Sequence, residues 1–329
     1  MRMNQAFSRC VAAVVVAAAV LLGADARAAG TPIKVGYNQW IGFAQAYVAK
    51  DKGIFAKHGL EVELVAFPGP GDSLPPLIAG HLDLTLSCPD NVVLLHGTES
   101  DAVVSVFQID TSAGADGIVA KKSIASAKDL KGKKVAATVG QVNHLLMLMA
   151  LQNAGLTEQD VELVNMNADD AGAAFIAGAL DAAATWEPWL SKAAAANGHV
   201  LFSSKDAPGI LGDCIVATRA ATQSKADVIR RFIAAMDEGV QYVRSNPDES
   251  MTITAKYLGV KPAEAAEMLT KVKIFTIEDN KKLFGTAEKP GPQYAAMKTV
   301  GDFMSSHGVT KKNPDPKNMI DPQFVQRAK

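Results

Sequence analysis

The chain has 329 residues, of which 48% are hydrophobic, and its 33 basic and 34 acidic side chains leave a formal charge of −1. A chain of this length can bury the core of one large domain or of two ordinary ones. The near-neutral charge, without a basic stripe, argues against binding to nucleic acid or to an anionic membrane surface.

The amino terminus has the three parts of a secretory signal peptide. Arg2 and Arg9 give a positive start, residues 11–22 form an uninterrupted apolar run, and residues 26–28 read Ala-Arg-Ala, with small side chains where a signal peptidase reads the chain. The apolar run is too short for a bilayer, which needs roughly 20 residues, so a membrane anchor is the disfavoured alternative. We predict cleavage near Ala28 and a mature protein in the periplasm.

Strand and helix patterns alternate from residue 33 onward. Apolar, β-branched runs predict four strands, at residues 33–37, 60–67, 82–86 and 103–107. Stretches bounded by glycine or begun by proline predict helices between them, at residues 44–52, 55–58 and 73–79. This rhythm is typical of an α/β domain with a largely parallel sheet.

A second set of alternating elements follows Asp116. Strands are predicted at residues 117–120, 134–138, 161–166, 181–185 and 199–202, and a strand at residues 214–217 leads away. Helices are predicted at residues 127–130, 143–153, 171–177 and 188–197. From Lys225 on the pattern is helical only, with further helices at residues 261–272 and 293–307 and an extended tail around residues 313–322.

Two α/β units without a flexible linker predict an α/β protein of two lobes joined by chain crossings. We expect each lobe to hold a mixed, mostly parallel sheet flanked by helices. The crossings are predicted near residues 110–117 and 213–217, so that lobe 1 comprises residues 31–116 and 216–329 and lobe 2 residues 117–215. Ligands of open α/β sheets bind at the carboxyl ends of the strands, which places a ligand in the cleft between the lobes.

Six short segments stand in a characteristic order. They are Gly-Tyr-Asn-Gln-Trp at residues 36–40, Ala-Lys-Asp-Lys-Gly-Ile-Phe at 49–55, His-Gly-Leu-Glu-Val-Glu at 58–63, Ala-Gly-His-Leu-Asp at 79–83, Asp-Leu-Lys-Gly-Lys-Lys-Val at 129–135, and Gly-Ala-Leu-Asp-Ala-Ala-Ala-Thr-Trp-Glu-Pro-Trp at 178–189. Together they resemble the substrate-binding proteins of bacterial ABC importers in the nitrate/sulfonate/taurine family. The resemblance implies the type II periplasmic binding fold, closure of the lobes on a small solute, and delivery to an inner-membrane permease and its ATPase. The chain departs from many members at Ala44 and Gln45, where they carry a proline.

Metal and catalytic patterns are missing from the sequence. None of the six histidines stands in metal-ligand spacing, and no Gly-x-Ser-x-Gly, His-Glu-x-x-His or P-loop occurs. Cys10 precedes the apolar run and does not stand at a lipidation site, while Cys88 and Cys214 form either a disulfide or, as we favour, two separate buried thiols. We expect no metal, no cofactor and no enzymatic activity. A sensor, or a protein of thiamine-pyrimidine binding or synthesis with the same fold, is the alternative.

In lobe 1 the candidate ligand residues lie in loops that follow predicted strands or at the first crossing. They are Asn38, Gln39, Trp40, Ser87, Asn91 and Asp110. Trp40 offers an apolar wall or a face for a cation, and its alternative role is packing within the lobe. Helix capping would equally explain Ser87 and Asn91.

In lobe 2 and at the return crossing the candidates are Gly140, Gln141, His144, Trp186, Glu187 and Asp213. Gly140 lets the chain approach a ligand closely, and the start of the helix that follows favours an anionic group. His144 either donates to that group or packs, and Glu187 pairs with either a ligand amine or a base of lobe 1. The resemblance implies that Asp213 meets a ligand ammonium group, as in taurine-binding members; a solvated turn is the alternative.

The predicted cleft is acidic and its loops contain no arginine. Its carboxylates are Asp90, Asp110, Asp116, Glu187 and Asp213. Because an anion such as nitrate is usually met by cationic side chains, we predict a small zwitterionic or sulfonate/amine-type solute. We expect a monomer that binds this solute and the importer, and no nucleic acid.

Overall fold

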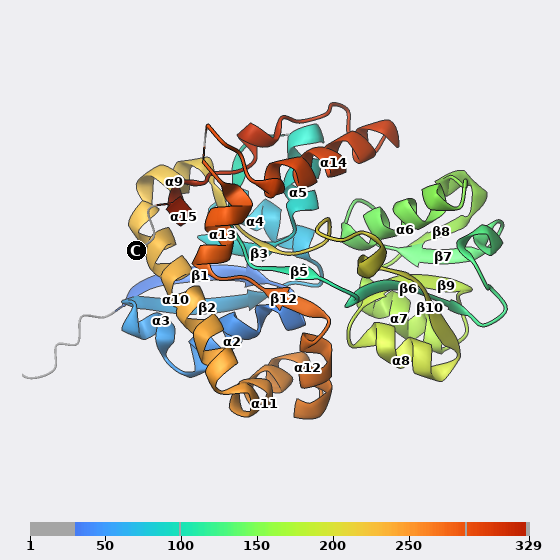
Figure 1. Cartoon of the computed structure of the whole chain (residues 1–329), viewed down its shortest axis with the longest axis horizontal. Coiled ribbons are helices and arrows are strands. Elements are labelled where there is room, and N and C mark those ends of the chain that lie inside the picture. The colour runs from blue at the N-terminus through green and yellow to red at the C-terminus, as the bar shows by residue number, and fades with distance from the viewer. Residues whose placement is uncertain (1–29, 99, 287, 327–329) are drawn as a thin grey trace, which may run out of the picture.

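The computed structural model describes residues 30–98, 100–286 and 288–326. The predicted signal peptide, residues 1–28, lies outside these residues. Two separate five-stranded sheets organise the molecule, and the chain passes from the first to the second and back (Figure 1). The structure therefore has the two lobes that the strand and helix pattern predicts.

The first sheet has the strand order β2-β1-β3-β11-β4, and only β11 runs antiparallel to its neighbours. Its strands are β1 (Thr31–Tyr37), β2 (Leu60–Ala66), β3 (Leu84–Ser87), β4 (Val103–Gln108) and β11 (Cys214–Thr218). Strands β3 and β4 are buried along their whole length, as expected for parallel strands with helices on both faces.

Helices from both ends of the chain cover this sheet. They are α2 (Ala44–Asp51), α3 (Ile54–Lys57), α4 (Leu74–Ile78), α5 (Pro89–Thr98), α9 (Arg219–Ser224) and α10 (Ala226–Ser245). The helical pattern predicted from Lys225 on begins with α10, and on its buried face Phe232 stacks on Phe55 at a centroid distance of 5.1 Å. This contact fixes the carboxyl-terminal half of the chain to lobe 1.

The second sheet has the order β10-β6-β9-β7-β8, in which only β6 runs antiparallel to its neighbours. Its strands are β6 (Asp116–Lys121), β7 (Lys134–Ala137), β8 (Glu162–Asn165), β9 (Ala182–Trp186) and β10 (Gly198–Ser203), and its helices are α6 (Val142–Asn153), α7 (Ala168–Ile176) and α8 (Trp189–Ala196). The central strand β9 is buried throughout. Its three alanines leave room for close packing of helices on both faces.

The two crossings lie side by side. The first is a short strand, β5 (Asp110–Ser112), with the residues up to Ala115, and the second runs over residues 204–213. Ser112 N–H donates to Leu211 O at 3.0 Å and Ile109 N–H donates to Asp213 O at 2.7 Å. The return crossing thus begins earlier in the chain than predicted, because β11 starts at Cys214 and belongs to the first sheet.

The expectation of helices only after Lys225 is wrong at β12 (Val272–Ile274), which pairs antiparallel with β5 (Figure 1). Val272 and Ile274 are buried and Lys273 is exposed, a period of two that marks a strand. The helix predicted at 261–272 is therefore shorter. The helices of this region are α11 (Pro247–Leu258), α12 (Pro262–Leu269), α13 (Ile277–Phe284), α14 (Pro292–Ser306) and α15 (Gln323–Gln326).

Short 3₁₀ helices complete the described chain, at η1 (Ile41–Phe43), η2 (Pro70–Ser73), η3 (Ala127–Leu130), η4 (Glu158–Asp160), η5 (Ser204–Asp206) and η6 (Pro316–Asn318). The tail lies along the edge strand β4, where Ser105 N–H donates to Met319 O at 2.8 Å. Over the described residues, no helix is long and apolar enough to cross a membrane. Cys88 and Cys214 are both buried and unbridged, as favoured from the sequence.

Candidate ligand-binding site

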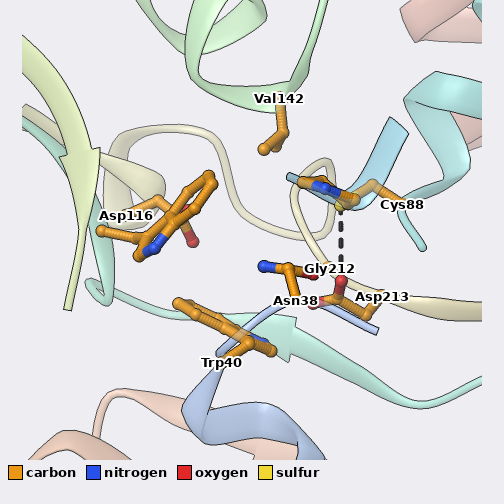
Figure 2. Close-up of a pocket in the computed structure, with 9 residues that line it drawn as sticks. Asn38, Trp40, Cys88, Asp116, Val142, Gly212 and Asp213 are labelled. Carbon is orange, nitrogen blue, oxygen red and sulfur yellow. Dashed lines mark hydrogen bonds between the residues drawn. The ribbon is translucent and has the colours of Figure 1, made fainter. Parts of the chain in front are cut away.

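A cavity between the two lobes gathers residues from the carboxyl ends of parallel strands. Asn38 follows β1, Cys88 follows β3 and Trp186 ends β9, while the antiparallel crossing strands bring Asp116 and Asp213 to the same edge. The nine lining residues are Asn38, Trp40, Pro70, Cys88, Asp116, Val142, Trp186, Gly212 and Asp213 (Figure 2). About 270 Å³ of empty space lies among them, and this figure includes space that is open to solvent.

Trp40 is held in place by a buried carboxylate behind it. Its indole Nε1–H donates to Asp110 Oδ2 at 2.9 Å, and its backbone N–H donates to the Tyr47 hydroxyl at 3.3 Å. A β-carbon on Gly42 would collide with the Asp110 carboxylate and the Trp40 indole nitrogen. Glycine at position 42 therefore permits the indole and the carboxylate to meet, and Asp110 supports the cavity wall rather than lining the cavity.

Asp213, at the end of the second crossing, is fixed by Asp110 of the first crossing and by a thiol. Its backbone N–H donates to Asp110 Oδ1 at 3.1 Å, and its side-chain Oδ1 accepts from Cys88 Sγ at 3.3 Å (Figure 2). Gly212 precedes it, where a β-carbon would collide with Asp110 O. The side chain thus reaches the cavity from a rigid part of the hinge region.

Burial dominates the ionisation of the carboxyl groups around the cavity. It raises the pKa of Asp116 and of Asp90 from 3.8 to about 7 and that of Asp110 to about 6. Burial, together with the negative charges of Asp110 and Asp116, raises the pKa of Asp213 well above its ordinary value. None of the nine lining residues is basic. A cationic group in the cavity would therefore lower the pKa of these carboxyl groups and favour their charged form.

Asn38 brings a free amide to the same space. It is 4% exposed, and its Oδ1 has no hydrogen-bond partner. Figure 2 shows its amide between Trp40 and Asp213. A buried polar atom without a partner costs about 1–3 kcal/mol, so the amide is suited to accept a hydrogen bond from a solute.

The predicted residues at the start of α6 bond within their own loop or across the cleft. Gly140 adopts a positive φ of 81° and its N–H donates to His144 Nδ1 at 3.2 Å, while His144 Nε2 lies 2.8 Å from the Glu158 carboxylate. Gln141 reaches lobe 1, where its Nε2 lies 3.5 Å from Asp72 Oδ1. Of this segment only Val142, which sequence reasoning did not select, lines the cavity.

Glu187 is occupied by protein partners. Its Oε1 accepts from Lys271 Nζ at 2.6 Å and from Ser191 Oγ at 2.7 Å, and its Oε2 accepts from Ser191 N–H at 3.1 Å. The Glu187 side chain is fully buried and that of Lys271 is 25% exposed. The sequence left open whether Glu187 pairs with a ligand amine or with a base of lobe 1. The arrangement matches the second alternative, with Lys271 as the base.

The remaining predicted residues surround the cavity without lining it. Ser87 Oγ donates to Pro70 O at 2.8 Å and accepts from Asn91 Nδ2 at 3.4 Å, which supports the loop that carries Pro70. Gln39 donates to Tyr257 O at 2.9 Å and lines a neighbouring hollow that shares Trp186. The structure thus brings four of the twelve predicted residues to the cavity itself: Asn38, Trp40, Trp186 and Asp213.

Five lining residues were absent from the predicted set: Pro70, Cys88, Asp116, Val142 and Gly212. Three of them, Cys88, Val142 and Gly212, are adjacent to predicted residues, and Asp116 belongs to the acidic residues noted in the sequence. Pro70 could have been found from its place after the carboxyl end of β2. No such rule selects which side chain of a loop turns inward.

The site offers hydrogen-bond acceptors and aromatic walls, and little for covalent chemistry. Within the described part of the chain, no cluster of three His, Cys, Asp or Glu side chains is arranged to hold a metal ion. Burial and the charge of Asp213 raise the pKa of the Cys88 thiol well above its usual range. Since the thiolate is the nucleophile, Cys88 at neutral pH is a weak one.

The comparison with known families decides the relationship. The family described as NMT1/THI5 like matches residues 40–250, which is more than half of the chain. The chain belongs to the NMT1/THI5-like family. The resemblance predicted from the six sequence segments is confirmed.

Individual relatives extend over nearly the whole chain. A putative binding protein of Brucella abortus is 27% identical over 92% of this chain and 93% of its own length. The taurine-binding periplasmic protein of Escherichia coli is 25% identical over 85% of this chain and 89% of its own length. The alkanesulfonate-binding protein SsuA from Xanthomonas axonopodis pv. citri, solved bound to MOPS, matches 90% of this chain and 99% of its own with a TM-score of 0.76 at 19% identity. This structural likeness confirms the two-lobed periplasmic binding fold.

Proposed function

We propose that the protein is the extracytoplasmic solute-binding component of an ABC import system. It binds a small zwitterionic or sulfonate/amine-type solute between its lobes and delivers it to an inner-membrane permease with its ATPase. The observation that carries the proposal is the interlobe cavity, in which the unpaired amide of Asn38 lies with Trp40 and Asp213. The names of the taurine-binding and alkanesulfonate-binding relatives support the solute class.

Within this proposal the solute has two recognised ends. Asp213, with Asp116 nearby, receives the ammonium end, because buried carboxylates without basic neighbours favour a cation. The sulfonate or other anionic end faces the start of α6 at Val142, where the helix has no side-chain cap. The first-turn N–H groups of a helix are natural partners for an anion. Trp40 and Trp186 supply the apolar walls.

The supporting residues act indirectly. Asp110 positions Trp40, Ser87 and Asn91 hold the loop of Pro70, and Gly140 and His144 shape the start of α6. Gln141 and Glu187 contact residues of the opposite lobe, and Gln39 bonds to Tyr257 within lobe 1. We place lobe 1 at residues 31–116 and 216–329 and lobe 2 at residues 117–215. The sheets differ from these bounds by one or two residues, since Asp116 begins β6 of the second sheet and Cys214 begins β11 of the first.

We further propose that the protein is a monomer of the periplasm, exported by the signal peptide and cleaved near Ala28. The periplasmic relative supports this location. A role as a binding protein rather than an enzyme agrees with the raised pKa of the Cys88 thiol and with the relatives, whose names describe binding.

The test is a thermal-shift screen of the protein from residue 29 onward with taurine, ethanesulfonate, nitrate, bicarbonate, thiamine precursors and simple amines. A solute present at 100 times its Kd stabilises the folded state by about 2.7 kcal/mol, so a true ligand raises the Tm measurably. We expect an amine-bearing compound to do so and nitrate not to. Stabilisation by nitrate alone would overturn the solute class, and no stabilisation by any compound would count against the binding role.

A further inference from the structure

The first crossing, from β5 to β6, contains one residue with unusual backbone freedom. Gly114 has a φ of 116°, a conformation that side-chain-bearing residues rarely adopt. It lies in the three-residue link Ala113-Gly114-Ala115 between β5 and β6. A rotation of lobe 2 against lobe 1 at this crossing must pass through these residues.

Both residues of an ion pair are attached to this link, one on each side of Gly114. On the lobe 1 side, Ala113 N–H donates to Lys271 O at 2.8 Å; on the lobe 2 side, Glu187 N–H donates to Ala115 O at 2.9 Å. The side chains then meet, with Lys271 Nζ 2.6 Å from Glu187 Oε1. The backbone contacts and the ion pair therefore close a ring around Gly114.

The ion pair of Lys271 and Glu187 is a stronger contact between the lobes than the hydrogen bonds of Gln141 near the cavity. The fully buried Glu187 carboxylate has three donors, namely Lys271 Nζ, Ser191 Oγ and Ser191 N–H, and Lys271 Nζ also lies 3.1 Å from Ser191 Oγ. The contacts of Gln141 with Gly71 and Asp72 are both 3.5 Å long, at the limit of a hydrogen bond. A buried carboxylate that loses its cation is strongly destabilised unless it reaches water.

We propose that Lys271 is a positioning residue that, with Glu187, clasps the hinge at Gly114 and holds the two lobes closed over the solute cavity. The proposal rests on the proposed function, since it assumes that the lobes open to admit a solute. Lys271 does not line the cavity, so it acts on affinity through the closed population alone. Opening rotates Glu187 away from Lys271 and exposes its carboxylate to water.

The experiment measures the distance between the lobes in the solute-free protein. Spin labels at Lys256→Cys on α11 and Ala195→Cys on α8 report this distance by double electron–electron resonance. Both positions are exposed, and Cys88 and Cys214 are buried. We expect Lys271→Met to shift the closed-to-open ratio of the solute-free protein at least tenfold towards open, relative to the wild type.

Three further variants separate a clasp from a general loss of structure. Lys271→Arg should keep the closed-to-open ratio of the wild type, and Glu187→Gln combined with Lys271→Met should recover part of it, because no buried charge is then left alone. Lys121→Met is the matched control, since Lys121 pairs with Asp181 at 2.7 Å inside lobe 2; it should leave the distance unchanged. Equal closed-to-open ratios in the wild type and Lys271→Met would overturn the clasp. Because no solute is used, such a result would leave the outcome of the solute screen unaffected.

Discussion

At the scale of single residues, the cavity is defined by which polar groups have partners and which do not. The Trp40 indole N–H, the Ser87 hydroxyl and the Glu187 carboxylate are all bonded within the protein. Asn38 Oδ1 and Asp90 Oδ2 are buried without a partner. Most polar side chains near the cleft therefore bond to other parts of the protein, and few polar groups remain to bond to the solute.

Asp213→Asn should weaken an amine-bearing solute about tenfold or more, because a hydrogen bond to a charged group contributes about 1.5–3 kcal/mol. The fold should persist, since an asparagine Oδ1 can still accept from Cys88 and the backbone N–H still reaches Asp110. Calorimetric titration with the solute found in the screen measures the change. Asp170→Asn, at an exposed carboxylate of α7, is the control. Equal affinities of Asp213→Asn and the wild type would remove Asp213 from the ligand contacts.

At the scale of elements, the antiparallel strands β6 and β11 are those that begin at the cavity edge. Each starts directly after a crossing, which carries Asp116 and Asp213 to the carboxyl ends of the neighbouring parallel strands. The helix α13, for which no pattern was recognised in the sequence, secures the same region from outside. Its buried Asn280 accepts from Gln108 N–H at 2.7 Å and donates to Gln108 O at 2.8 Å, just before the first crossing.

Asn280→Ala should therefore lower the free energy of unfolding by about 2–4 kcal/mol, because it leaves a buried N–H and a buried carbonyl of Gln108 without partners. Urea denaturation followed by circular dichroism gives the value. The matched variant Asn197→Ala, at an exposed position after α8, should change it by less than about 0.5 kcal/mol. An equally small decrease in the free energy of unfolding for Asn280→Ala would mean that the two hydrogen bonds between Asn280 and Gln108 do not stabilise the fold.

At the scale of the whole molecule, folding collects acidic groups from both lobes into one buried cluster. Asp90 begins α5, Asp110 and Asp213 flank the crossings, and Asp116 begins β6. A carboxyl group whose pKa is raised on folding gives stability that is full at low pH and is lost as the pH rises through the folded-state pKa. His96, whose pKa is lowered by burial, acts in the opposite direction, but it is one group against four.

The solute-free protein should therefore be more stable at pH 5.5 than at pH 8. For Asp116, with a pKa of about 7 in the folded state, the loss between pH 5.5 and 7 is about 2 kcal/mol, which corresponds to a few degrees in Tm. Asp116→Asn removes this contribution, so its Tm should fall less across the range. Differential scanning calorimetry at both pH values measures the difference. Parallel pH profiles of the variant and the wild type would show that Asp116 is not a buried, protonated group.

The sequence by itself determined the alternation of strands and helices, the division into two lobes and the family, because these depend on local periodicity and on short segments in a fixed order. It also indicated Asn38, Trp40, Trp186 and Asp213, each next to the end of a strand or at a crossing. Local patterns missed β12, since a three-residue strand carries too little periodicity without its partner β5. Only the tertiary structure decided which loop residues turn inward, that Glu187 meets Lys271, and that Asp110 supports Trp40. These contacts join residues far apart in the chain, and their geometry depends on how the two lobes pack.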